Sequence, residues 1–160
     1  MPQDYPASLS FLLSQVGAEV AQRFAADLQA IKLTPREFAV LHLVEQHGSR
    51  TQQQLADALG MQRNNMATTA DQMQRAGLIT RRPHPDDGRA LRVELSAEGR
   101  RRLTSASAVA PHLDATLADL LSPQQLGQLR RALTALAAGL ELVPGVHPQL
   151  ATPQPRARHD

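Results

Sequence analysis

The chain has 160 residues, of which 42% are hydrophobic and 20% charged, enough for one compact domain with an added oligomerisation element. Only 2% are aromatic, and a Leu- and Ala-rich core argues against sandwiches, barrels and parallel sheets. The absence of Cys excludes disulfides, thiolate zinc sites and cysteine nucleophiles. No signal peptide is evident, and no stretch approaches the roughly 20 apolar residues of a membrane helix. We therefore expect a mostly helical cytoplasmic protein.

Basic residues concentrate in the middle of the chain. Between Arg50 and Arg102 there are ten arginines and six acidic residues, a net charge of +4, whereas the remainder carries −2. A basic segment between mildly acidic flanks is typical of a protein that turns one face toward phosphate groups. A solvated charged face is the alternative that charge alone leaves open.

Two helices are predicted in the first 48 residues. Apolar residues spaced three and four apart predict a long amphipathic helix over residues 9–31, with Ser8 as its N-cap. Thr34-Pro35-Arg36-Glu37 combines a capping box with proline at the first helical position. A second helix therefore begins there, and Gly48 ends it.

The next segment predicts a helix-turn-helix. Thr51-Gln52-Gln53-Gln54 is a second capping box, which opens a short helix that ends at Gly60. A further helix spans about residues 63–76 and ends at Gly77. A short helix, a tight turn with glycine and a second helix are the parts of this motif.

A β-hairpin follows, which makes the motif a winged one. Residues 78–82 are short and Arg-rich, and residues 91–95 alternate apolar and charged side chains as a half-buried strand does. Between them, Asp87-Gly88 is a strong hairpin-turn signal. The predicted fold class is therefore mainly α with a short β-hairpin wing, a winged helix-turn-helix domain joined to a helical dimerisation region.

The last part of the chain is helical again. Ser96 begins a long helix that reaches about Leu120, and Pro111 should kink it because proline removes one backbone donor. Ser122-Pro123-Gln124-Gln125 is a third capping box and opens a last helix that ends near Leu140. Residues 143–160 contain several prolines without periodicity, which predicts a mobile tail.

Polar residues crowd the first two turns of the helix over 63–76, while its apolar residues face inward. Asn can pair bidentately with adenine and Arg with guanine, and the methyl of Thr can touch the thymine methyl. We therefore predict that this helix reads the major groove of double-stranded DNA. The predicted base-reading residues are Arg63, Asn64, Asn65, Thr68 and Thr69.

The hairpin carries the most specific resemblance. Residues 87–90 (DGRA) followed by 91–99 (LRVELSAEG) resemble the wing signature of the MarR family of bacterial transcriptional regulators. Residues 54–60, 74–79 and 121–126 also match that family, and the resemblance runs over about residues 8–142. It implies a homodimeric winged helix-turn-helix protein on a pseudo-palindromic operator. Such a protein is usually a repressor released by a small ligand, often an aromatic acid.

The resemblance also assigns roles within the wing. It implies that Arg89 enters the minor groove, which is consistent with the attraction of Arg to the negative potential of a narrow groove. It implies that Asp87 orients Arg89 or the wing turn rather than touching DNA. Gln62 is a departure, because the family often has Ser or Thr there as a better N-cap. The Asn64-Asn65 pair leaves the preferred base sequence undetermined.

A dimer is expected even without the resemblance, because three long helices have apolar stripes that a small winged domain cannot cover. Their 3-4 spacing suits helix pairing between chains, and packing within one chain is the alternative. A two-fold dimer would place its two DNA-reading helices roughly 34 Å apart. The predicted dimer contacts are Leu13, Val16, Leu113, Leu117, Leu126, Leu129, Leu133 and Leu136. The predicted regions are 1–33 (dimerisation helix), 34–95 (winged DNA-binding domain), 96–142 (dimerisation helices) and 143–160 (disordered tail).

The pattern leaves two other functional classes to consider. A protein–protein interaction module without specific DNA binding could use the same fold, but it would not need base-reading residues beside Arg89. An enzyme is not expected, because the sequence has no Gly-rich phosphate loop and no recognisable catalytic residues. The six His form no close pair, so we expect neither metal nor cofactor. Arg23, Arg36 and His42 are possible lining residues of an effector pocket.

Overall fold

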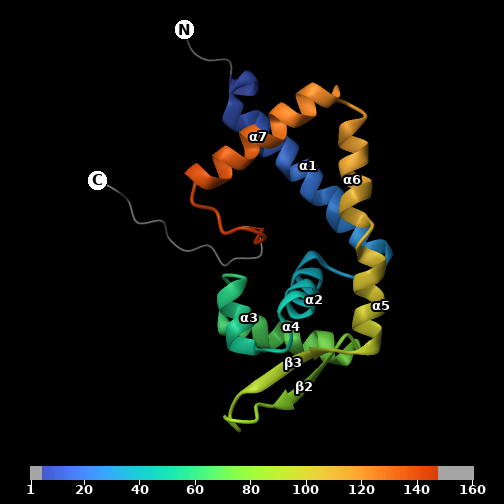
Figure 1. Cartoon of the computed structure of the whole chain (residues 1–160), viewed down its shortest axis with the longest axis vertical. Coiled ribbons are helices and arrows are strands. Elements are labelled where there is room, and N and C mark those ends of the chain that lie inside the picture. The colour runs from blue at the N-terminus through green and yellow to red at the C-terminus, as the bar shows by residue number, and fades with distance from the viewer. Residues whose placement is uncertain (1–4, 148–160) are drawn as a thin grey trace, which may run out of the picture.

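The computed structural model describes residues 5–147, a chain of helices with one small sheet at one end (Figure 1). This arrangement confirms the predicted mainly helical fold with a β-hairpin wing. In chain order its elements are η1 (Tyr5–Ala7), α1 (Leu9–Ala30), α2 (Pro35–His47), β1 (Arg50–Thr51), α3 (Gln52–Ala58), α4 (Arg63–Arg75), β2 (Ile79–Pro83), β3 (Leu91–Leu95), α5 (Ala97–Ala106), α6 (Val109–Ala118) and α7 (Pro123–Gly139).

The predicted helix boundaries are confirmed by their caps. Ser8 accepts a hydrogen bond from the N–H of Phe11 and so begins α1. Complete capping boxes begin α2, α3 and α7, at 34–37, 51–54 and 122–125. Each pairs two backbone N–H groups that the first turn leaves without intrahelical acceptors. The glycines that follow α2, α3 and α4 all adopt positive φ, with values of 74°, 62° and 72°.

The sheet has three antiparallel strands in the order β1-β3-β2. In the hairpin, Ile79 lies opposite Leu95 and Pro83 opposite Leu91. The sequence did not predict β1, because two residues are too few to show a period. The hairpin turn predicted at Asp87-Gly88 is confirmed: residues 84–90 make the loop between β2 and β3, and Gly88 does not have positive φ. A loop of this length does not need the left-handed residues of a two-residue turn.

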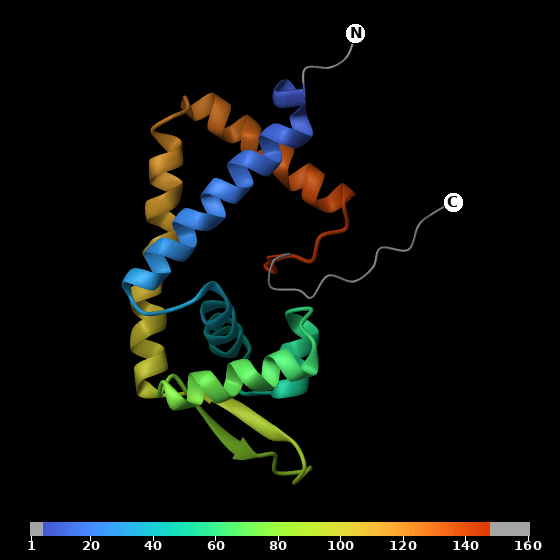
Figure 2. The same cartoon turned by 180° about the vertical axis from the view of Figure 1, so that it is seen from behind.

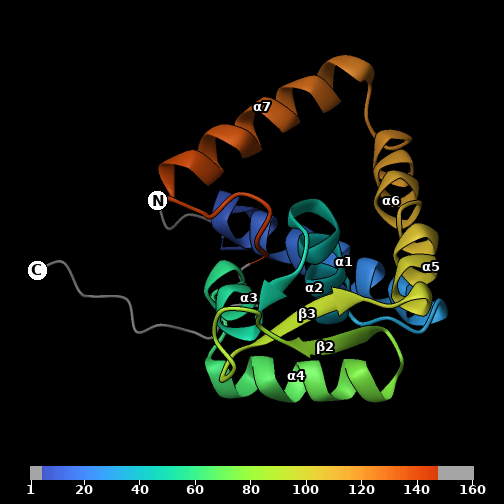
Figure 3. The same ribbon diagram turned by 60° about the horizontal axis from the view of Figure 1, so that its bottom comes forward.

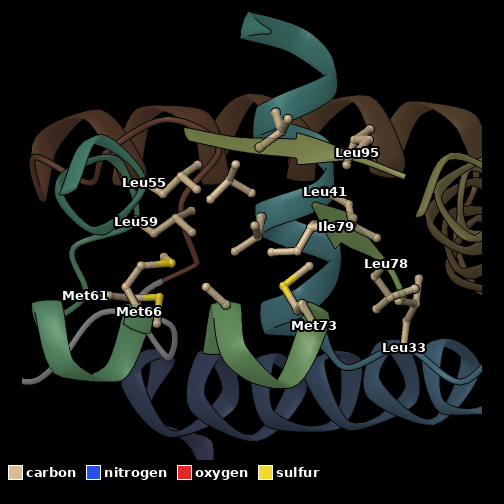
Figure 4. Close-up of a cluster of buried hydrophobic side chains, with 14 of the residues drawn as sticks. Leu33, Leu41, Leu55, Leu59, Met61, Met66, Met73, Leu78, Ile79 and Leu95 are labelled. Carbon is tan, nitrogen blue, oxygen red and sulfur yellow. The ribbon is translucent and has the colours of Figure 1, made fainter. Parts of the chain in front are cut away.

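The hydrophobic core lies where α2, α3, α4 and the sheet meet. Figure 4 shows Leu55, Met66 and Met73 converging with Leu41 and Ile79 from different elements. Each of these five side chains is at most 2% exposed. The inward face predicted for α4 is thereby confirmed, and the core fixes this helix relative to the wing.

A close contact at Gly99 joins the hairpin to α5. A Cβ at this position would lie 2.0 Å from the carbonyl oxygen of Leu78. The same oxygen accepts a hydrogen bond from the N–H of Ser96 at 3.1 Å. Only glycine fits here, which gives a physical reason for the last residue of the wing signature.

The predicted long helix after Ser96 is two helices, and the disturbance expected from Pro111 falls in the turn before it, as a complete break rather than a kink. The break lies at residues 107–108, between α5 and α6. Ser107 ends α5, with its N–H donating to the carbonyls of Leu103 and Thr104. Pro111 is the third residue of α6, four residues after Ser107, so the break lies where its ring would clash with a carbonyl of a continuous helix.

The other half of the molecule consists of α1, α6 and α7. Helix α6 packs against α1, whereas α7 extends away from the rest of the chain (Figure 3). The structure describes all of α7, and none of its residues is buried. In the described part of the chain, 5–147, no helix is long and apolar enough to cross a membrane.

The predicted dimer residues divide into three groups. Leu113 is buried within the chain, so its prediction as an intersubunit contact was wrong; α6 packs against α1 of its own chain. Leu117 and Leu126 are half-buried. The remaining five are exposed: Leu13, Val16, Leu129, Leu133 and Leu136. Of the predicted tail, residues 143–147 are described, and 148–160 lie outside the described residues.

Candidate nucleic-acid interface

Helix α4 presents most of the predicted base-reading residues to solvent. Arg63, Asn64, Asn65 and Thr68 are all exposed. Met66 and Met73, on the opposite face, are buried in the core. The core therefore fixes which face of α4 is free to meet a ligand, and that face is polar.

Thr69 does not belong to this exposed face. Its side chain is only 4% exposed, and its hydroxyl donates to the carbonyl of Asn65 at 2.8 Å. Its prediction as a base reader was wrong. Positions 66, 69, 70 and 73 follow three- and four-residue steps and lie on one helix face, and that face is the buried one.

The start of α4 differs from those of α1, α2, α3 and α7. Gln62 is its N-cap residue, and the Gln62 side chain makes no capping hydrogen bond. This agrees with the lower capping tendency of Gln compared with Ser or Thr.

The wing tip is organised around Asp87. Its carboxylate accepts the backbone N–H of Arg89 at 3.0 Å, and its carbonyl accepts the N–H of Ala90 at 3.0 Å. His84 then donates its N–H to the carbonyl of Ala90 at 2.9 Å, which closes the loop. Asp87 thus shapes the turn through the backbone of Arg89, while the Arg89 residue is exposed.

The wing tip and the start of α4 share one cavity. Figure 3 shows the β2–β3 loop close to α3 and the first turn of α4. Between them is an open cavity of about 310 Å³. It is lined by Thr51, Gln52, Gln53, Arg63, Asp87, Arg89, Ala90 and Leu91. The structure therefore brings the first residue of α4 and the wing-tip arginine together, which the sequence alone did not predict.

The ten central arginines divide into two groups. Six are held by other parts of the chain: Arg81 by Asp71 at 2.7 Å and by Gln74, Arg82 by Glu94, Arg92 by Ser49, Arg100 by Glu45, and Arg101 and Arg102 by Glu98. The other four side chains have no ion pair or hydrogen bond within residues 5–147: Arg50, Arg63, Arg75 and Arg89. These four guanidinium groups are not neutralised by a counter-charge within the described residues.

Glu98 has a structural role at the start of α5. The hydrogen bond from Arg101, together with the positive charges of Arg101 and Arg102, holds the pKa of the Glu98 carboxyl below its ordinary value. Arg102 also donates to the carbonyls of Ile31 and Lys32 at 3.1 and 3.0 Å. The arginine run at 100–102 is therefore engaged mostly within the protein.

The possible effector residues lie near the junction of α1 and α2. The ring of His42 stacks on Phe38 with centroids 5.7 Å apart, and Phe38 meets Phe24 edge-on at the same distance. Arg23 is paired with Glu19 at 2.6 Å, and Arg36 is exposed. Among the described residues no group of three or more His, Asp or Glu could hold a metal ion.

Comparisons with known proteins agree with this geometry. Residues 33–91 match the model of the MarR family. An HTH-type transcriptional repressor of Mycobacterium tuberculosis is 32% identical over 133 residues, which cover 82% of this chain and 95% of that protein. Among solved structures, the transcriptional repressor CouR bound to a 23-mer DNA duplex superposes with a TM-score of 0.74 at 27% identity, covering 86% and 97% of the two chains.

CouR from Rhodococcus jostii has also been solved with p-coumaroyl-CoA, and that structure matches at 25% identity with a TM-score of 0.67, covering 84% of this chain and 95% of the other. These relatives share the helix-turn-helix, the wing and the flanking helices over most of their length. The chain belongs to the MarR family of winged helix-turn-helix transcriptional regulators.

Proposed function

We propose that two copies of this chain bind a pseudo-palindromic operator and repress nearby genes, with each copy placing α4 in a major groove. Asn64, Asn65 and Thr68 then face base edges, and Arg89 at the wing tip enters the adjacent minor groove. A regulator of this kind acts in the cytoplasm, where the DNA is. The proposal draws on the relatives described as transcriptional repressors.

One observation carries this proposal. The exposed face of α4 is polar and has no acidic residue in its first two turns. It shares a cavity with Arg89, the wing arginine that has no partner within residues 5–147. A protein–protein adaptor built on the same fold would not need amide side chains and a free arginine at these places. The family relatives favour the DNA-binding function over that alternative.

The second copy is proposed to pair through α1 and α7. Val16 on α1 is 56% exposed, and Leu133 on α7 is 44% exposed. Leu13, Leu129 and Leu136 extend these apolar stripes. Fully burying an exposed apolar side chain of this size is favourable by roughly 1.5–3 kcal/mol. These side chains are already about half-buried, so a partner that covers both helices gains about half of that for each one.

A small effector is proposed to release the DNA. The solved relative with p-coumaroyl-CoA supports an aromatic acid or its derivative as the ligand class. In this chain, Phe24, Phe38 and His42 provide aromatic surface where α1 meets α2. Adding p-coumaroyl-CoA to the protein–DNA complex tests this class directly, because a ligand that prefers the free protein must lower the apparent affinity for DNA.

Fluorescence anisotropy tests the function itself. The purified protein is titrated into labelled duplex from its own upstream region and, separately, into a scrambled duplex, at several salt concentrations. We expect tighter binding to the upstream duplex and a steep negative salt dependence. Selection from a random DNA library serves as the second test, because the operator can lie elsewhere. Failure of that selection to enrich any sequence would contradict the proposal.

A further inference from the structure

We propose that the cavity between the wing tip and the start of α4 holds one backbone phosphate of the bound duplex, with Arg63 and the side-chain amide of Gln52 as its ligands. The inference rests on the proposed function. It assigns Arg63 to the DNA backbone rather than to a base edge, in contrast to the expectation from the sequence.

The geometry of the duplex places a backbone strand at this cavity. If α4 occupies a major groove and the wing occupies the adjacent minor groove, one sugar-phosphate strand separates the two. Arg63 is the first residue of α4, and Arg89 lies at the tip of the wing. The cavity of about 310 Å³ lies between these two residues, so the strand that separates the grooves passes over it.

The charge of the cavity suits an anion. Arg63 and Arg89 both lack a partner within residues 5–147. Of the lining residues only Asp87 is acidic, and its carboxylate already accepts the backbone N–H of Arg89. The lining therefore keeps a net charge of +1, and the planar guanidinium is well matched to phosphate oxygens.

Gln52 provides an independent observation. Its side-chain Nε2 is buried and has no hydrogen-bond partner among the described residues. Its neighbours are engaged: the amide of Gln53 donates to Asp57 at 2.5 Å, and Gln54 closes the capping box with Thr51. A buried donor without an acceptor costs free energy. A turn of the Gln52 amide toward the cavity would bring Nε2 to a phosphate oxygen and give it the acceptor that it lacks among the described residues.

Arg63 differs from the predicted base-reading residues because it lines the cavity. Asn64, Asn65 and Thr68 are exposed on α4 but do not line the cavity, whereas Arg63 does. Base recognition then depends on the two asparagines and the threonine, and Arg63 sets how deeply and in which register α4 lies in the groove.

The first test compares Arg63→Gln with Arg75→Gln in the full-length protein, on the tightest duplex recovered from a random library and on its scrambled form. Arg75 is the matched control: it also lacks a partner within residues 5–147 and lies at the other end of α4, roughly 18 Å away by helix rise. For Arg63→Gln we expect about tenfold weaker binding to both duplexes. The salt slope should be smaller by about 1.8, because each of the two copies loses one phosphate contact worth about 0.9. For Arg75→Gln we expect a change of less than about twofold, because it is far from the proposed phosphate.

The second test identifies the phosphate. Duplexes carrying one neutral methylphosphonate at a time are titrated with the wild-type protein and with Arg63→Gln. We expect that a methylphosphonate at one position in each half-site causes the largest loss of DNA affinity with the wild-type protein. The same methylphosphonate should cause no further loss of affinity with Arg63→Gln. Gln52→Met should also reduce the loss at that position. It should not lower the stability of the free protein, because the donor it removes has no acceptor there.

The outcomes separate the two proposals. A wild-type protein that does not distinguish the selected duplex from its scrambled form contradicts the proposed function itself. If the protein does distinguish them, the function stands and the phosphate assignment is tested separately. That assignment is overturned if, at every methylphosphonate position, the loss of DNA affinity is the same in the wild type and in Arg63→Gln. Relaxed base preference at one position with an unchanged salt slope would make Arg63 a base reader and would overturn it as well.

Discussion

The winged part of the chain, α2 to β3, and the helical part formed by α1, α6 and α7 use similar amino acids in different ways. In the winged part, Leu41, Leu55, Met73 and Val93 are almost completely buried. In the helical part, α7 has the same Leu- and Ala-rich composition and no buried residue within Pro123–Gly139. Figure 2, seen from behind, shows the two parts connected through α5 at one edge.

The difference indicates what each part requires. The winged part closes a core on itself, so its surface is free for a ligand. The helical part leaves apolar stripes in water, as expected of an element that folds against a second copy. The winged part should therefore tolerate surface changes without unfolding, whereas the helical part should lose its assembly when its stripes are altered.

Removal of α7 should have the largest effect. A chain that ends after Leu121 should lose dimerisation completely, because it lacks one of the two proposed pairing helices. Analytical ultracentrifugation measures this, with a chain that ends after His147 as the control that keeps α7. Since truncation can also impair folding, Leu133→Glu is the second variant: it should give a folded monomer, whereas Gln128→Glu on the same helix should remain a dimer. A stable dimer without α7 would contradict the pairing proposal.

Gly99→Ala should weaken the attachment of α5 to the winged part. Its new Cβ would collide with the carbonyl of Leu78, and overpacking of this kind costs about 1–3 kcal/mol. Urea unfolding measures the loss. Gly88→Ala is the control, because its Cβ meets nothing within 4 Å and its φ is not positive. A larger loss at Gly88 than at Gly99 would mean that the wing turn, rather than this contact, requires glycine.

Much of the fold could be predicted because its signals are local. Capping boxes and terminal glycines placed α2, α3, α4 and α7 to within a residue or two. The break before α6 was predicted only in part. Pro111 predicts a disturbance in the turn before it, and the helix does break at residues 107–108. A proline signal does not report whether the helix kinks or ends, and residues 96–120 keep one apolar period across the break.

The candidate site was partly predictable for the same reason. Residue type and motif position predicted that Asn64, Asn65, Thr68 and Arg89 face outward, and the structure shows all four exposed. Thr69 was included because it is a polar residue in the first two turns of the helix, and only the packed core shows that its position faces inward. The proximity of Gln52 to Arg63 and Arg89 depends on how the wing folds back toward α3, a long-range contact for which no local signal exists.

Arg89→Ala should affect DNA binding without affecting assembly. Loss of the wing-tip contact should weaken binding to the selected duplex by about 1–3 kcal/mol, while sedimentation should still show a dimer. Arg82→Ala is the matched control in the same wing, because Arg82 is already paired with Glu94 at 3.5 Å. Equal affinities of the wild type and Arg89→Ala would mean that the wing does not enter the groove.

The smallest effect separates two adjacent threonines. Thr68→Ala removes an exposed methyl and hydroxyl, so it should weaken binding to the selected duplex by roughly 1 kcal/mol with little change in stability. Thr69→Val keeps the buried shape but loses the hydroxyl that donates to Asn65, so it should lower the free energy of unfolding by up to about 1 kcal/mol and leave DNA affinity unchanged. Anisotropy and urea unfolding on both variants measure the two quantities. If Thr69→Val weakened DNA binding while Thr68→Ala did not, the inward assignment of Thr69 would be wrong, and with it the orientation of α4 on which the base-reading residues depend.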